Sequence, residues 1–134
     1  MKKKRVIILS VVLFLVIAGF IGVKAMLAST ESNLESLKYM ELAQIDLTAI
    51  EDGIYTGSYS VFPVSAQVSV TIKNHVIVGI DLIEHINGQG TPAEVIPDMV
   101  VKSQSLQVDS VSGATYSSRV ILKAIENALL RAKP

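Results

Sequence analysis

The stretch AQVSVTIKNHVIVGIDLI, residues 66–83, decides the fold. Its first half alternates apolar and polar side chains, so that three apolar residues share one face of a strand: Val68, Val70 and Ile72. A polar break follows at Asn74 and His75, and a second run of strand-forming residues begins at Val76. We therefore predict an antiparallel hairpin that turns at Asn74 and His75 and belongs to a sheet with one buried face.

A strand precedes this hairpin and helices follow it. Residues 54–60 (IYTGSYS) alternate and are rich in β-formers, which predicts a strand. Residues 117–131 carry apolar side chains along one continuous helical face. A shorter helix is predicted from about Pro92 to Ser105, or from Pro97 onward, because proline suits the first turn of a helix and not its interior. The fold class is α+β, a small antiparallel sheet packed with two helices.

The N-terminal part is an apolar run long enough to cross a membrane. Residues 6–23 (VIILSVVLFLVIAGFIGV) would make a helix of about 27 Å, against a hydrocarbon core of roughly 30 Å. The preceding MKKKR places the N-terminus in the cytoplasm and the rest of the chain beyond the membrane. A cleaved signal peptide has a similar start but usually a shorter apolar core, of about 7–15 residues. We predict a single-pass anchor or signal-anchor over residues 1–28, with a cleaved signal as the alternative.

A stalk is predicted between this anchor and the globular domain. It covers residues 29–50, in which Ser32 and Glu35 match a capping box ahead of a partly amphipathic helical pattern. We interpret the stalk as a spacer that holds the domain off the bilayer. The globular domain is predicted over residues 51–134.

Charge and composition exclude several classes of function. Residues 1–28 hold five of the 12 basic side chains and no acid, so the remainder carries a net charge of −5. Such an acidic body does not attract phosphate backbones, and we predict no nucleic-acid partner. The chain has no cysteine, which excludes disulfides, thiolate metal sites and cysteine nucleophiles. Its two histidines have no ligand-spaced partners, and no nucleophile–base pair is evident, so we predict neither a metal site nor catalytic residues.

The chemistry is carried by a turn rich in serine, glycine and threonine, DSVSGATYSS, residues 109–118. It opens onto the last predicted helix, where amide groups without partners and the positive pole of the dipole favour an anion such as phosphate. Gly113 allows the backbone to approach the anion closely. Four hydroxyl groups can donate to its oxygens: Ser112, Thr115, Ser117 and Ser118. The alternative is that Ser112 or Ser117 is an ordinary helix N-cap.

The pattern Asp109-x-x-Ser112-Gly113-Ala114-Thr115 resembles the flavinylation motif of the FMN-binding domain family. That family includes the domain in the C subunit of the sodium-translocating NADH:quinone oxidoreductase, the G subunit of Rnf-type complexes, and small membrane-anchored flavoproteins. The resemblance covers roughly residues 52–132. It implies FMN joined through its phosphate, as a phosphoester, to Thr115. A separate FAD-dependent flavin transferase that needs magnesium makes this bond in the family.

The resemblance also assigns roles to other residues. The predicted cofactor-binding set around Thr115 comprises Asp109, Ser112, Gly113, Ala114, Ser117, Ser118, His85, Gly88 and Gly90. Asp109 belongs to the sequence that the transferase reads, or else is a turn-forming aspartate. His85, Gly88 and Gly90 form a glycine loop that contacts the flavin, or else is an ordinary turn. Subunits of the large complexes tend to have a Thr-Pro-Gly-x-Gly type of loop there, so this chain looks more like the small stand-alone members.

Together these features predict an electron carrier. We expect a membrane-anchored, extracytoplasmic flavoprotein with covalent FMN, which passes electrons between membrane and extracytoplasmic redox partners and is not a stand-alone enzyme. One alternative is a non-redox adapter or assembly domain of a membrane redox complex that keeps the fold without using flavin. Another is a reductase domain that acts directly on a small acceptor.

Overall fold

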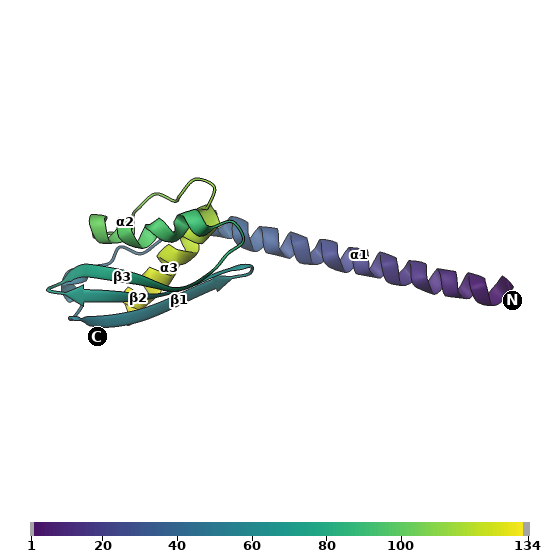
Figure 1. Ribbon diagram of the computed structural model, residues 1–134, viewed down its shortest axis with the longest axis horizontal. Coiled ribbons are helices and arrows are strands. Elements are labelled where there is room, and N and C mark those ends of the chain that lie inside the picture. The colour runs from purple at the N-terminus through teal and green to yellow at the C-terminus, as the bar shows by residue number, and fades with distance from the viewer. Residues whose placement is uncertain (1, 133–134) are drawn as a thin grey trace. The chain divides into compact units, whose positions relative to one another are not determined.

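The computed structural model describes residues 2–132 and divides the chain into two compact units, which meet between Ser32 and Asn33. The first unit consists of the apolar part of helix α1 (Lys2–Lys38), labelled in Figure 1. Among the described residues, α1 is the one helix whose length and composition allow it to cross a membrane. A signal sequence meets the same test.

Helix α1 continues without a break through Ser32 to Lys38. The predicted capping box at Ser32 and Glu35 is therefore wrong. A cap satisfies amide groups at the start of a helix, whereas the amide groups around Ser32 already find carbonyl partners four residues earlier in α1.

Three strands form one antiparallel sheet in the second unit, in the order β1-β2-β3. They are β1 (Gly53–Val61), β2 (Val64–Lys73) and β3 (Val76–Ile86). The predicted turn is confirmed: Asn74 and His75 join β2 to β3 with φ values of 53° and 62°. Two consecutive positive φ angles are what a two-residue hairpin turn requires.

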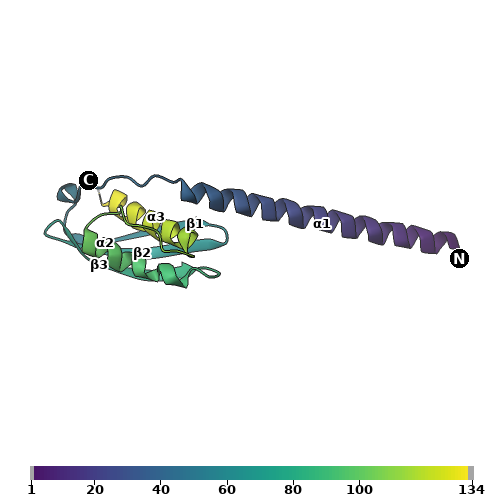
Figure 2. The ribbon, with the colours of Figure 1, turned by 90° about the horizontal axis from the view of Figure 1, so that it is seen from above.

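Two helices cover one face of this sheet. Helix α3 (Thr115–Arg131) packs on β1 and β2, and α2 (Ile96–Ser103) packs on β3, as Figure 2 shows. The predicted apolar faces of both β2 and α3 are buried in the core. The predicted helix from Pro92 to Ser105 is divided into a 3-10 helix, η2 (Thr91–Val95), and α2, in whose first turn Pro97 lies. The alternative start near Pro97 is therefore confirmed.

Gly57 of β1 allows the sheet to lie close to α3. A methyl group on Gly57 would come within 2.8 Å of the Ala128 Cβ and still closer to the backbone of the helix. No side chain fits between β1 and α3 at this point.

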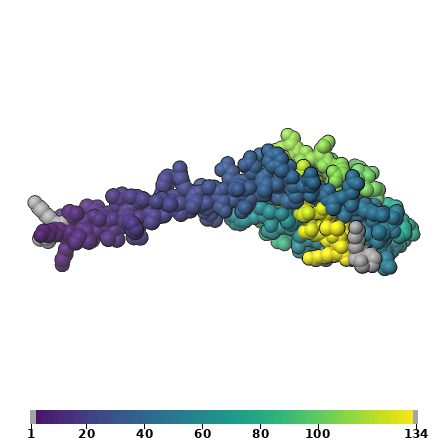
Figure 3. All heavy atoms as spheres, turned by 180° about the vertical axis from the view of Figure 1, so that it is seen from behind, coloured from purple at the N-terminus to yellow at the C-terminus, as the bar shows by residue number. Residues whose placement is uncertain are grey.

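The second unit begins at Asn33, so most of the stretch expected as a spacer belongs to it. Leu37 and Ile50 are both 0% exposed and are part of the hydrophobic core. Between them the chain has no regular secondary structure over residues 40–46 and then forms the short 3-10 helix η1 (Leu47–Ala49). Its backbone is bound by side chains of the domain: the Glu126 carboxylate accepts the Ala43 N–H at 2.6 Å, and Gln107 donates to the Leu42 carbonyl. Figure 3 shows this blue segment lying against the domain beside yellow α3.

Candidate functional site

Helix α3 begins at Thr115, two residues before its predicted start. Its N-cap is Ala114, no side chain caps it, and its first turn contains no acidic residue. The alternative in which Ser112 or Ser117 is an N-cap is therefore wrong. A helix start without a side-chain cap retains amide groups that can bind an anion.

Hydrogen bonds of the Ser118 side chain stabilise the turn that leads into α3. This side chain is fully buried, donates to the Ala114 carbonyl at 2.8 Å and accepts the Val111 N–H at 3.0 Å. The Ala114 N–H closes the turn on the Val111 carbonyl. Gly113 supplies the positive φ, 78°, that this turn needs. The hydroxyl hydrogen of Ser118 is thus used within the turn, which presents Thr115 at the helix start.

A cavity of about 130 Å³ lies beside Thr115. It brings together the glycine loop and the motif, with Val64 of β2 as a further wall. Its lining residues are Val64, Gly88, Gln89, Gly90, Gly113, Ala114, Thr115, Tyr116 and Ser117. Sites for complete small-molecule ligands usually measure about 300–1,000 Å³. This cavity therefore accommodates a phosphate-sized group, and the rest of a flavin would lie outside it.

Four of the predicted site residues do not line this cavity. Ser112 is exposed on the turn, and Ser118 lies beneath it. Asp109 is also exposed, and it borders a separate shallow hollow that contains Lys102. His85 lies behind the glycine loop. The role of Asp109 in recognition by a transferase stays a prediction.

The glycine loop contacts α3 where Gly90 lies against Ser117. A methyl group on Gly90 would come within 2.6 Å of the Ser117 Cβ and still closer to its hydroxyl oxygen. Because the φ of Gly90 is −89°, glycine is needed here for its missing side chain and not for its backbone freedom. Gly88 differs, since a methyl group there would meet no atom within 4 Å.

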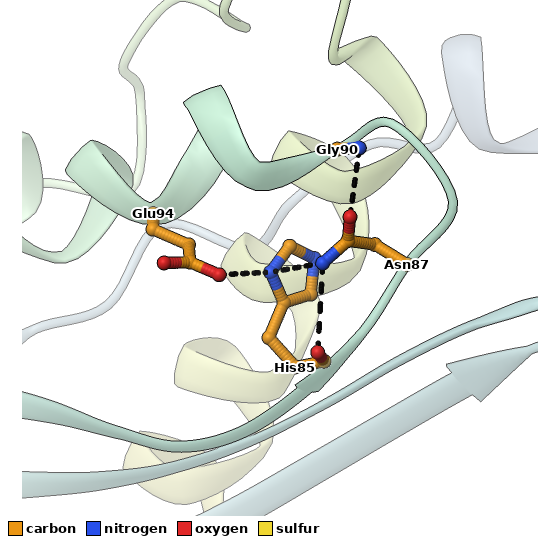
Figure 4. Close-up of polar contacts among 4 residues, drawn as sticks. All are labelled: His85, Asn87, Gly90 and Glu94. Atoms are coloured by element: carbon orange, nitrogen blue, oxygen red, sulfur yellow. Dashed lines mark hydrogen bonds and ion pairs between the residues drawn. The ribbon is translucent and has the colours of Figure 1, made fainter.

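A polar cluster lies behind the loop (Figure 4). The His85 Nδ1 is 3.1 Å from a Glu94 carboxylate oxygen and 3.1 Å from the Asn87 amide nitrogen. The Asn87 amide oxygen accepts the Gly90 N–H at 2.9 Å. Neither Asn87 nor Glu94 was among the predicted site residues; an asparagine beside a glycine indicates only a turn.

Lys38 adds a positive charge near the start of α3. Its ammonium group lies 5.6 Å from the centre of the Tyr116 ring, which is within the range of a cation–π interaction. Tyr116 directly follows Thr115 in the first turn of the helix. The last residue of α1 therefore contributes a cation beside Tyr116, which lines the cavity.

The chain matches the FMN-binding domain family over residues 64–130, half of its length. It belongs to that family. The matched region runs from β2 to α3 and contains both segments that line the cavity. The chain is also similar to the NADH:acrylate oxidoreductase of Vibrio harveyi, with 31% identity over 104 residues. This similarity covers 74% of the chain but only 10% of the oxidoreductase, so the chain spans about a tenth of that relative.

Proposed function

We propose that this protein is a membrane-anchored electron carrier whose FMN is attached by a phosphoester bond to Thr115. The observation that carries the proposal is the position of Thr115. It is the first residue of a helix that no side chain caps, it lines a phosphate-sized cavity, and it is the last residue of the motif. Family membership and the oxidoreductase relative support a flavin-binding role in electron transfer.

The residues around Thr115 fit the phosphate end of FMN. The open amide groups of α3 and the Lys38 ammonium provide positive potential, and Gly113 leaves free space beside the turn. Bound FMN supplies the electron chemistry, and the protein holds it and tunes its surroundings. Because the cavity is too small to enclose a flavin, a covalent bond explains how the domain would retain the cofactor.

Attachment requires only that a transferase reach the Thr115 hydroxyl, which is half-buried at the mouth of the turn. With FAD as donor, the Thr115 Oγ1 forms a bond to the phosphorus of the FMN half. The bond from that phosphorus to the phosphate oxygen of AMP breaks, and AMP leaves with the hydroxyl proton. No electron is transferred in this step.

We further propose that α1 is the membrane anchor, with its N-terminus in the cytoplasm and the flavin domain outside. The basic residues that precede the apolar run support this orientation. Redox partners would then lie in the membrane or in the extracytoplasmic space. We therefore propose a carrier that passes electrons between these partners.

Intact-protein mass tests the attachment. The full chain is co-expressed with a flavin transferase, beside Thr115→Val, which removes the hydroxyl, and Thr56→Val as a matched control, the same substitution at an exposed position of β1 outside the motif. We expect a gain of one FMN less one water in the wild type and in the control, and none in Thr115→Val. An unmodified wild type, with a transferase proven active on a known substrate, would refute the carrier and favour the non-redox adapter.

The orientation has a separate test, which uses the absence of cysteine from the chain. Ser60→Cys places a thiol at an exposed position of β1. We expect a membrane-impermeant maleimide to label it in intact cells or spheroplasts. Labelling only after lysis would overturn the proposed orientation.

A further inference from the structure

His85 is linked to both ends of the glycine loop, residues 87–90 (Figure 4). It is the second-last residue of β3, the strand that directly precedes the loop. Its Nδ1 is 3.1 Å from the carboxylate of Glu94, which belongs to η2, directly after the loop. The same atom is 3.1 Å from the amide nitrogen of Asn87, inside the loop. The imidazole ring therefore bridges the strand, the loop and the helix that follows.

The orientation of the Asn87 amide connects this ring to Gly90. The amide oxygen accepts the Gly90 N–H, and an amide nitrogen cannot do so. The nitrogen must therefore face His85, where it is also 3.5 Å from the backbone carbonyl. The connection ends at Gly90, which lies against Ser117, two residues after the proposed flavin attachment point.

The His85 Nδ1 faces a hydrogen-bond acceptor, the Glu94 carboxylate, and a hydrogen-bond donor, the Asn87 amide nitrogen. With a proton it donates to Glu94, and without one it accepts from Asn87. The other ring nitrogen, Nε2, is buried and has no partner among residues 2–132, and the side chain is only 2% exposed. Leaving a buried polar atom unpaired is unfavourable. Stability alone therefore does not account for an imidazole ring at this position.

We propose that His85 is a positioning residue for the flavin. Through Asn87 and Gly90 it sets the position of the loop that walls the cavity beside Thr115, and in this way it sets the surroundings of the cofactor. His85 does not line the cavity itself, so it acts through the loop and not by the direct contact that the sequence predicted. The part of this inference that concerns flavin rests on the proposed function.

Two substitutions of His85 separate its two nitrogens. In His85→Asn the amide oxygen can take the place of Nδ1 and accept from Asn87, whereas in His85→Gln the amide group extends to the place of Nε2. Of these two variants, only His85→Asn should keep the hydrogen bond between Asn87 and residue 85. Glu94→Ala removes the competing partner of Nδ1, at a side chain that is 45% exposed, and leaves Nδ1 free to accept from Asn87. His75→Gln is the matched control, because His75 is exposed in the β2–β3 turn.

The first readout needs no flavin: the hydrogen-exchange rate of the Gly90 amide in the unmodified full chain. We expect exchange roughly tenfold faster in His85→Gln, as for the loss of one hydrogen bond. The rates in His85→Asn, Glu94→Ala and His75→Gln should be no faster than in the wild type. Equal rates in His85→Asn and His85→Gln, or faster exchange in Glu94→Ala, would overturn the link.

The second readout is the visible spectrum and midpoint potential of attached FMN. Both should shift in His85→Gln and stay unchanged in His85→Asn and His75→Gln. Faster Gly90 exchange with an unchanged flavin would show a purely structural role and overturn the proposal. A wild type without flavin would overturn the proposed function and the flavin part of this inference, while the exchange rate would still decide the link to the loop.

Discussion

Replacing Gly90 by alanine would force a methyl group into the first turn of α3. The new carbon would come within 2.6 Å of the Ser117 Cβ and 3.2 Å of the Asn87 Cβ, whereas carbon atoms in contact prefer about 3.5–4.0 Å. The Ser117 hydroxyl can rotate away, but its Cβ is fixed by the helix backbone. The loop and the helix must therefore move apart by about 1 Å, so that the separation of 2.6 Å from the Ser117 Cβ reaches the preferred contact distance of about 3.5–4.0 Å.

We expect this overpacking to lower the free energy of unfolding by about 2 kcal/mol, within the usual range of about 1–3 kcal/mol. For a unit of about 100 residues, each kcal/mol lowers Tm by about 4–8 °C. The expected fall for Gly90→Ala is therefore about 8–16 °C. Gly88→Ala, in the same loop, meets no atom within 4 Å and should change stability by less than about 0.5 kcal/mol.

Thermal unfolding of the full chain in detergent, followed by far-UV circular dichroism, measures both variants. A double variant identifies the cause of the loss. Ser117→Gly removes the atoms that clash, at its own cost of about 0.5–1 kcal/mol for a glycine in a helix. When it is present, Gly90→Ala should lose less than half of its effect. Strictly additive losses, or equal losses in Gly90→Ala and Gly88→Ala, would refute the close approach of loop and helix.

Three further substitutions test other parts of the domain. Gly57→Ala should lower the free energy of unfolding by about 3 kcal/mol in urea titrations, because its methyl group meets helix backbone, whereas Gly79→Ala has open space and should change it by less than about 0.5 kcal/mol. Glu126→Ala should speed hydrogen exchange of the Ala43 amide about tenfold, because that amide loses its bond to a charged acceptor; an unchanged rate would contradict the link. Ser118→Ala should lower stability by about 1–3 kcal/mol, since the turn before α3 loses both bonds to the buried hydroxyl, and unchanged thermal unfolding would show that the turn does not depend on them.

Local patterns were sufficient to predict the sheet and the last helix. The alternation in β2 and the helical repeat in α3 each reflect a face that is buried along its whole length. The burial of Leu37 and Ile50 could not be predicted, because it depends on docking against elements far along the chain. The start of α3 was also missed, since preferences for a capping side chain favour serine and not Ala114.

The candidate site was predicted in part. The motif and the resemblance indicated Thr115 and the glycine loop, and the structure brings the two segments to one cavity. Asn87 and Glu94 were missed because nothing in their local sequence distinguishes them from solvated turn and helix residues. Their significance comes only from the position of His85 between them.

The order of elements has a consequence for biosynthesis. Helix α3 follows all three strands in the chain, yet it is the element that covers the apolar face of β2. At about 5–20 residues per second, the ribosome needs several seconds to reach the end of α3 after β2 is complete. Until then the sheet is uncovered, and Thr115 lacks the helix that shapes its turn. An attachment reaction that depends on that turn would modify only chains that had finished folding.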